Sequence, residues 1–267
     1  MIRMFFRLGM FAAAVLAIVP APLWAAELAP HRAFYSLNLG QTRPGIAVVG
    51  ARGAMSIVLE KTCEGWITSQ RLSMAVYTSA DDGMVQEVDY TGWESLDGQS
   101  YRFASKELAD GERKYVKGMA LAAAPGSPGK AIYRTPEAKT IPLPAGTMFP
   151  AGHMAWLIDQ ALAGQRQAPR AVFDGIDGDG AWKVIAFIGP RVVPDKSRDV
   201  SAPLLERPGW KMRLAFYPLD SKASEPEYEV EVMQLDNGVA TEIVLDHRMF
   251  TAIFKLEKIE AVPPPDC

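Results

Sequence analysis

Histidine and cysteine are scarce in this sequence, with three histidines and two cysteines among 267 residues. The histidines, at positions 31, 153 and 247, lack the His-x-x-x-His spacing that places two imidazoles on one helix face. The acidic run from Asp174 to Gly180 lacks the alternating oxygen ligands and closing glutamate of a calcium loop. We therefore predict no bound metal, and we interpret the acidic run as a tight Gly/Asp hairpin.

Motifs for cofactor binding and nucleophilic catalysis are also missing. No Gly-x-Gly-x-x-Gly or Walker-type loop occurs, which argues against a nucleotide cofactor, and there is no Gly-x-Ser-x-Gly elbow. We predict a protein that is not an enzyme and has no cofactor. A hydrolase that uses a pair of the 31 acidic side chains is the catalytic alternative.

Positive charge is in short supply as well. The 28 basic and 31 acidic residues give a formal net charge of −3, and without Arg3 and Arg7 the balance is −5. No basic stripe is present to displace counterions from a phosphate backbone, so we predict that the protein does not bind nucleic acid.

Residues 1–26 have the pattern of a cleaved secretory signal peptide. Arg3 and Arg7 form its basic start, and an apolar run follows over residues 8–19. An uncleaved membrane anchor is the alternative, but it needs about 20 apolar residues, and Pro20 and Pro22 interrupt this run. We expect cleavage after Ala25 or Ala26, export from the cytoplasm and no permanent membrane anchor.

The only two cysteines, Cys63 and Cys267, form an even count in a chain that we expect to be exported. One disulfide is the first interpretation in an oxidising compartment. The alternatives are two free thiols or an intermolecular bridge. A bond between Cys63 and Cys267 would hold down the proline-rich C-terminus, and our hypothesis is that it closes the two ends of the sheet against each other.

From Ala33 onward, apolar residues recur at every second position, which is the period of a β-strand. Strands are expected over residues 66–77, 211–217, 227–235, 239–245 and 251–262, separated by turns such as Asp97-Gly98, Asp110-Gly111 and Asn237-Gly238. We predict roughly ten to twelve strands, mostly in antiparallel hairpins, that curl into a closed or coiled barrel. No linker divides residues 27–267, which we expect to form one domain, and Gly189–Gly209 is the longest predicted surface loop.

One segment, residues 150–163, has the helical period instead. It starts at Pro150, is followed by Gly164, and has Met154, Leu157 and Ile158 on one face, with Trp156 outside that stripe. Because so much of its surface is apolar, we expect the β-structure to surround this helix. Met154, Trp156, Leu157 and Ile158 are the candidate residues for an apolar ligand, although ordinary core packing is the alternative for them.

Two histidines have alternative interpretations. His31 and Arg32 form a candidate anion site, but a structural pair at the edge of the sheet, with its hydrogen bonds satisfied, is the stronger interpretation. His153, near the start of the predicted helix, has the same two interpretations.

A set of short segments occurs together in order along the chain. It comprises residues 28–35, Cys63 with Trp66, residues 143–150 with His153, Phe173-Asp174-Gly175 and the terminal Cys267. With this set the chain resembles the EipB family of alphaproteobacterial cell-envelope integrity proteins over residues 27–267. At Asp246-His247-Arg248 it departs from the family, in which a tyrosine and a small residue are expected after the aspartate.

The resemblance implies a mainly β protein of the periplasm, an antiparallel β-spiral whose lumen holds the helix, with a Cys63–Cys267 disulfide. It also implies a non-catalytic role in envelope maintenance, with a periplasmic tetratricopeptide-repeat protein as a partner. The expected function is to bind a protein partner or an apolar ligand. The alternative is a lipid or lipoprotein carrier with a half-open barrel.

Overall fold

The computed structural model describes residues 26–43, 45, 48–80, 83–122, 128–176, 178, 180–193, 202–246 and 249–267. The predicted signal peptide lies outside these residues, except for Ala26. Within them, no helix has the length and apolar character that crossing a membrane requires.

The described residues form fourteen β-strands, one α-helix and one short 3-10 helix. The strands of the first half are β1 (His31–Thr42), β2 (Val48–Lys61), β3 (Gly65–Thr78), β4 (Gly83–Ser95), β5 (Ser100–Ala109), β6 (Glu112–Leu121), β7 (Gly129–Thr135) and β8 (Lys139–Leu143). Helix α1 (Pro150–Leu162) follows, and the rest of the chain forms β9 (Gln167–Val172), β10 (Trp182–Val192), η1 (Pro203–Leu205), β11 (Gly209–Pro218), β12 (Tyr228–Leu235), β13 (Ala240–Asp246) and β14 (Phe250–Ala261).

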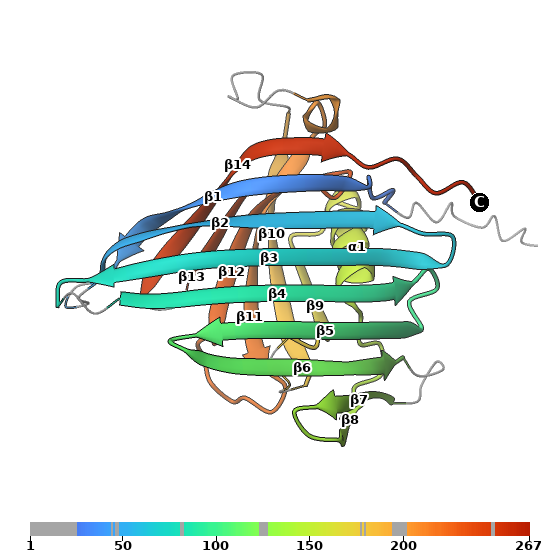
Figure 1. Cartoon of the computed structure of the whole chain (residues 1–267). Helices are drawn as coiled ribbons and strands as arrows, with labels where there is room; N and C mark the ends of the chain where they lie inside the picture. The colour runs from blue at the N-terminus through green and yellow to red at the C-terminus, as the bar shows by residue number, and fades with distance from the viewer. Residues whose placement is uncertain are drawn as a thin grey trace, which may run out of the picture.

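All fourteen strands belong to one antiparallel sheet, in which two meanders, β1–β8 and β9–β14, are joined by pairing of β1 with β14. The strand order ends at β8 on one side and at β9 on the other, so the sheet is not closed. Figure 1 shows the first meander in front, with β9–β13 crossing steeply behind it. The mainly β, coiled architecture with one helix is therefore as predicted.

The number of strands exceeds the predicted ten to twelve. Among the strands without a clear alternation in the sequence are β7 and β8, which are short, and β8 contains Pro142. Neighbouring strands impose the extended conformation on such segments, and a pattern in their own sequence is not needed.

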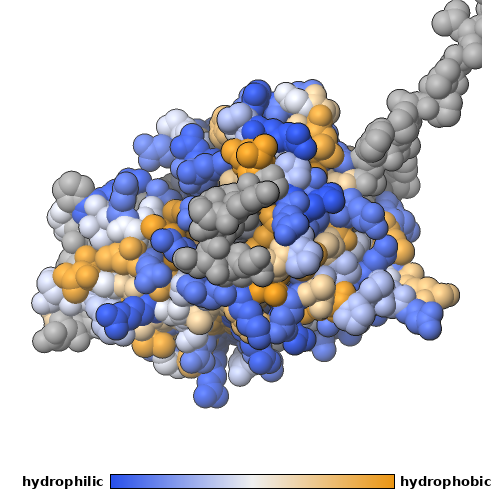
Figure 2. All heavy atoms as spheres, turned by 90° about the horizontal axis from the view of Figure 1, so that it is seen from above, coloured by the Kyte–Doolittle hydropathy of each residue, from blue (hydrophilic) through white to orange (hydrophobic). Residues whose placement is uncertain are grey.

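Alternation along β3 separates the inside of the spiral from its surface, on which hydrophilic and hydrophobic residues are interspersed in the view from above (Figure 2). Met74 and Val76 are buried, whereas Ser73 and Tyr77 on the other face are exposed. The same inner face of the sheet continues through β1, β2 and β14 and encloses one of the apolar clusters of the core. The predicted strand over residues 211–217 lies within β11, and β12 covers the predicted strand over residues 227–235 except Glu227.

Two predicted connections differ from those in the structure. Residues 173–181 form a long connection between β9 and β10 and not a tight hairpin, because Phe173 turns into the core with 0% exposure. Asp177 and Asp179 lie outside the described residues. The loop predicted over Gly189–Gly209 begins later than expected, because β10 continues to Val192. The loop also contains η1. Residues 194–201 of the loop lie outside the described residues.

Helix α1 connects the two end strands of the sheet, β8 and β9. It lies behind the front strands and in front of β9 and β10, inside the spiral (Figure 1), and it contacts β9 and β10. The predicted all-round burial is incomplete, because Leu162 in the last turn is 53% exposed. Each end strand contains a proline, Pro142 in β8 and Pro169 in β9, and Met148 forms an isolated bridge with Val172 at the β9 edge.

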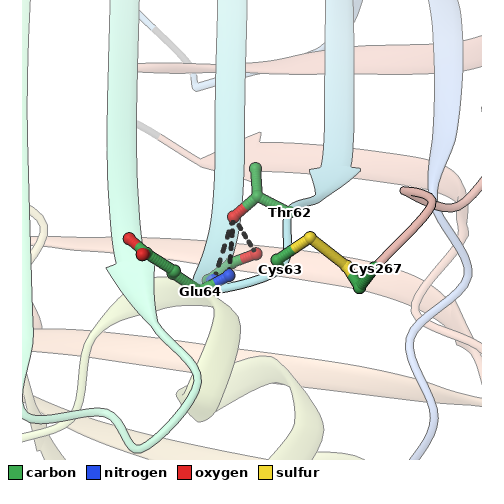
Figure 3. Close-up of a disulfide and its surroundings, with 5 residues drawn as sticks. Thr62, Cys63, Glu64 and Cys267 are labelled. Atoms are coloured by element: carbon green, nitrogen blue, oxygen red, sulfur yellow. Dashed lines mark hydrogen bonds between the residues drawn. A yellow bond between two sulfur atoms is a disulfide. The ribbon is translucent and has the colours of Figure 1, made fainter.

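The Cys63–Cys267 disulfide lies on the surface, with its Cα atoms 5.7 Å apart. Cys63 is in the turn between β2 and β3, where Thr62 Oγ1 accepts hydrogen bonds from the backbone N–H groups of Glu64 and Gly65 (Figure 3). The tail after β14 reaches this turn across the start of β1. The hypothesis that the bond closes the ends of the sheet is wrong, since the end strands β8 and β9 are elsewhere.

Candidate functional site

The four candidate ligand residues of α1 lie in two different environments. Leu157 and Ile158 are 5% and 0% exposed and pack in a core cluster with Val184 of β10 and Met212 of β11. Met154 and Trp156 are half-buried at the border of that cluster. Their role in ligand binding stays a prediction, whereas the packing role of Leu157 and Ile158 is clear from their contacts.

Trp156 is part of a stack that contains two cationic or titratable side chains. The Arg170 guanidinium lies 4.2 Å from its ring centroid, and the His153 ring is stacked at 5.9 Å. Burial, followed by the charge of Arg170, lowers the pKa of His153 to about 4. His153 is therefore neutral at physiological pH, and its Nε2 atom has no hydrogen-bond partner among the described residues.

His31 has the structural role that was the stronger interpretation, but it is not at a sheet edge. Strand β1 pairs with both β2 and β14. His31 is 3% exposed, its Nδ1 atom lies 2.7 Å from the Ala29 carbonyl oxygen, and burial lowers its pKa. A buried neutral imidazole is a poor anion ligand.

Glu94 of β4 is the residue that the sequence interpretation missed. It is 4% exposed, and its two carboxylate oxygens accept hydrogen bonds from the N–H groups of Ala151 (2.8 Å) and Gly152 (2.9 Å) in the first turn of α1. These are donors that a helix leaves free at its N-terminus. The N-cap residue, Phe149, supplies no side-chain acceptor, so a carboxylate from the sheet caps the helix instead.

Burial raises the pKa of Glu94 to about 7, and the two backbone hydrogen bonds oppose this shift. A signal for this residue does exist in the sequence. Tyr90, Gly92 and Glu94 occupy alternate positions of β4 and all point inward. A glutamate on an inward face indicates a buried partner, because an unpaired buried charge is costly.

The segment Phe173-Asp174-Gly175, which is part of the family resemblance, has a packing role. Phe173 lies edge-on to Tyr101, Phe103 and Phe149 of the aromatic cluster, with centroids 5.3–6.4 Å apart. The Asp174 carbonyl accepts hydrogen bonds from the hydroxyls of Tyr90 and Tyr101, both at 3.2 Å.

Gly175 fits this cluster for two reasons. Its φ of +73° is rarely adopted by other residues, and a Cβ atom there would lie 2.5 Å from the ring of Phe103. The segment thus locks the β9–β10 connection onto the inner face of β4 and β5.

A small cavity of about 290 Å³ opens beside the helix N-terminus. Glu94, Thr147, Gly152 and Arg170 contribute to its lining. The cavity contains the carboxyl group of Glu94 and the guanidinium group of Arg170, and Glu94 accepts hydrogen bonds from the helix. Its geometry therefore indicates a structural junction between sheet and helix.

Comparisons with known proteins agree with this architecture. The chain is 29% identical over 245 residues to a protein of Brucella abortus (strain 2308) named cell envelope integrity protein EipB, and the match covers 88% of this chain and 85% of that protein. A crystal structure from Brucella abortus, described as a beta-barrel-like protein of domain of unknown function DUF1849, superimposes with a TM-score of 0.82 at 27% identity. That superposition covers 90% of this chain and all of the other.

The family comparison spans nearly the whole of the expected mature chain. The EipB-like family model matches residues 23–263, which include all fourteen strands and the helix. The resemblance seen in the sequence is confirmed, and the chain belongs to the EipB-like family.

Proposed function

We propose that this protein acts in the periplasm as a non-catalytic binding protein that maintains the integrity of the cell envelope. The observation that supports the proposal most is the similarity, over 88% of the chain, to a protein named for envelope integrity. The helix and the aromatic cluster fill much of the interior with apolar side chains, so a protein partner would bind at the outer surface. The partner would be a periplasmic tetratricopeptide-repeat protein, as the family resemblance implies.

A strain that lacks the protein tests the role. We expect it to lose viability on a membrane-disrupting detergent, and expression of the intact chain restores growth. Capture of partners from envelope extract with the purified protein, followed by mass spectrometry, tests the binding role. Normal detergent resistance in the deletion strain contradicts the proposal.

A carrier of lipids or lipoproteins is the second candidate. The sheet is open between β8 and β9, and a cavity of about 750 Å³ lies at one end of the spiral, which supports it. Organic extraction of the purified protein and mass spectrometry distinguish the two functions. Co-purified acyl chains support a carrier, and their absence supports partner binding.

A further inference from the structure

The largest cavity among those described, with a volume of about 750 Å³, lies where the end of β8 approaches the ends of β10 and β11. No strand pairing joins β8 to β10 or β11, so this place is an opening of the spiral. We call it the mouth. Ile141 of β8 lies close to Gly180, on the other side of the opening. A Cβ atom added to Gly180 would lie 3.7 Å from the Ile141 side chain.

The walls of the mouth are poor in hydrogen-bond donors. Four of the lining residues are prolines, namely Pro128, Pro142, Pro144 and Pro218. Proline has no backbone N–H, so at these positions the chain presents only carbonyl oxygens and apolar ring carbons. An anion, which needs donors, finds none at these positions, whereas an apolar or cationic group is compatible with them.

The charged lining residues are both acidic. Asp220 and Glu227 contribute to the mouth, and neither lysine nor arginine is among its described lining residues. Asp220 belongs to a turn closed by a hydrogen bond from the Ser221 N–H to the Pro218 carbonyl (3.0 Å). Glu227 is fixed at its backbone by a hydrogen bond to the Phe216 carbonyl (2.8 Å). The backbone at both acidic residues is thus fixed at the rim, and their carboxylates are exposed there.

Trp182 contributes an aromatic ring to the mouth, and no described lysine or arginine side chain lies over that ring. Three other tryptophans, Trp66, Trp93 and Trp156, each have a lysine or arginine over the ring at 4.2–5.6 Å. Trp210 is buried, with 3% exposure. Trp182 is half-buried at the mouth, and among the described residues no cation lies over it. Its ring meets the rings of Phe216 and Tyr228 edge-on at 6.4 and 5.4 Å, and its buried part packs against the core cluster.

We propose that the mouth binds an amphipathic cation, a molecule with an apolar chain and a positively charged ammonium group. The apolar chain packs on the proline rings and Trp182, and the ammonium group lies between the Trp182 ring and the carboxylates of Asp220 and Glu227. Aromatic faces and carboxylates both attract such a group. This inference goes beyond the proposed binding of a protein partner, because it names a small-molecule ligand class and places its site away from the helix residues.

Isothermal titration of the purified protein tests the proposal with three probes of equal chain length, used below their micelle-forming concentrations. They are decyltrimethylammonium, decyl sulfate and the uncharged decyl maltoside. We expect the cation to bind most tightly and its affinity to fall with added salt, because exposed carboxylates are screened. Equal affinity for all three probes overturns the charge assignment, and binding of none overturns the site.

Variants locate the binding. Asp220→Asn with Glu227→Gln weakens decyltrimethylammonium binding by about fivefold, since each exposed charge contributes modestly. Trp182→Leu weakens it by about threefold. The matched control, Glu64→Gln with Glu112→Gln, changes the charge equally at exposed positions that do not line the mouth, and it leaves affinity unchanged. An equal loss in the control contradicts the site.

The same variants separate this inference from the proposed function. Glu227 and Asp220 are exposed, so their neutralisation preserves the fold, which circular dichroism verifies. If decyltrimethylammonium does not bind but the deletion strain remains sensitive to detergent, the ligand class is wrong and the envelope role stands. If the strain is not sensitive, the envelope role itself fails.

Discussion

Two contacts fix distant segments of this protein, and they differ in location and chemistry. Glu94 caps helix α1 from inside the spiral with two hydrogen bonds. The Cys63–Cys267 disulfide fastens the C-terminal tail on the surface, across the start of β1. The first contact satisfies buried polar groups of the native state, whereas the second constrains chiefly the unfolded chain. Their loss should therefore affect different properties.

Removal of the disulfide has the largest expected effect. Cys63→Ser and Cys267→Ser, singly or together, lower the free energy of unfolding by up to about 5 kcal/mol, because the bond closes a long loop of the unfolded chain. Denaturant titration measures the loss. Near-UV circular dichroism of the folded variants stays close to that of the parent, because no core residue is altered. Losses that add in the double variant contradict a single cross-link.

Truncation inside the helix comes next. Ile158→Ala lowers the free energy of unfolding by about 4 kcal/mol, since a fully buried side chain leaves a cavity. Leu162→Ala, on the same helix but 53% exposed, costs below about 1 kcal/mol. Similar losses in the two variants would show that the helix is not held inside the spiral as the structure has it.

The pH dependence of stability sharpens the contrast further. Glu94 has a raised pKa, so the folded state binds more protons than the unfolded state between about 4.5 and 7, and its contribution to stability falls as pH rises through this range. His153 has a lowered pKa, so the unfolded state binds more protons between about 4 and 6.5, and its contribution rises with pH. The two trends oppose each other in the parent protein.

Single variants should reveal each trend separately. In Glu94→Gln the histidine trend remains, and stability rises by about 3 kcal/mol from pH 4 to pH 6.5. In His153→Gln the glutamate trend remains, and stability falls by about 3 kcal/mol from pH 4.5 to pH 7. Thermal unfolding at several pH values measures both. Parallel pH profiles for the two variants contradict the assignment.

The smallest effect is expected at Gly152. In Gly152→Ala the new Cβ atom would lie 2.8 Å from Glu94 Oε1, so the carboxylate must shift. Alanine also favours the helix by about 1 kcal/mol, and the two contributions nearly cancel. Chemical denaturation should show a change within about 1 kcal/mol. A loss well above 1 kcal/mol would contradict the expected cancellation and show that the Glu94 side chain cannot shift.

The sequence predicts much of this fold because local signals agree with the tertiary structure. Alternation in β3 identifies Met74 and Val76 as inward-facing, and Pro150 and Gly164 mark the ends of the helix. The strand number was underestimated, because β8 extends only through pairing with β7. A strand that is extended because its neighbour pairs with it need not show the alternating pattern in its own sequence.

The site was harder to predict. Glu94 and the helix amides that it binds are separated by more than fifty residues, and only folding brings them together. The same holds for the mouth, where Trp182, Asp220 and Glu227 line one cavity from different parts of the chain. The four helix residues chosen from the sequence were selected by apolar character. That property identifies Leu157 and Ile158 as core just as well as it identifies a ligand site.

The prolines of the two end strands have a consequence for association. An unclosed sheet offers its outermost strands as templates for other chains, and long regular edges promote fibre formation. Pro142 in β8 and Pro169 in β9 each remove one amide donor from such a template, and the bridge of Met148 to Val172 occupies part of the β9 edge. The sheet can therefore remain open to a ligand while its edge strands disfavour pairing with other copies of the chain.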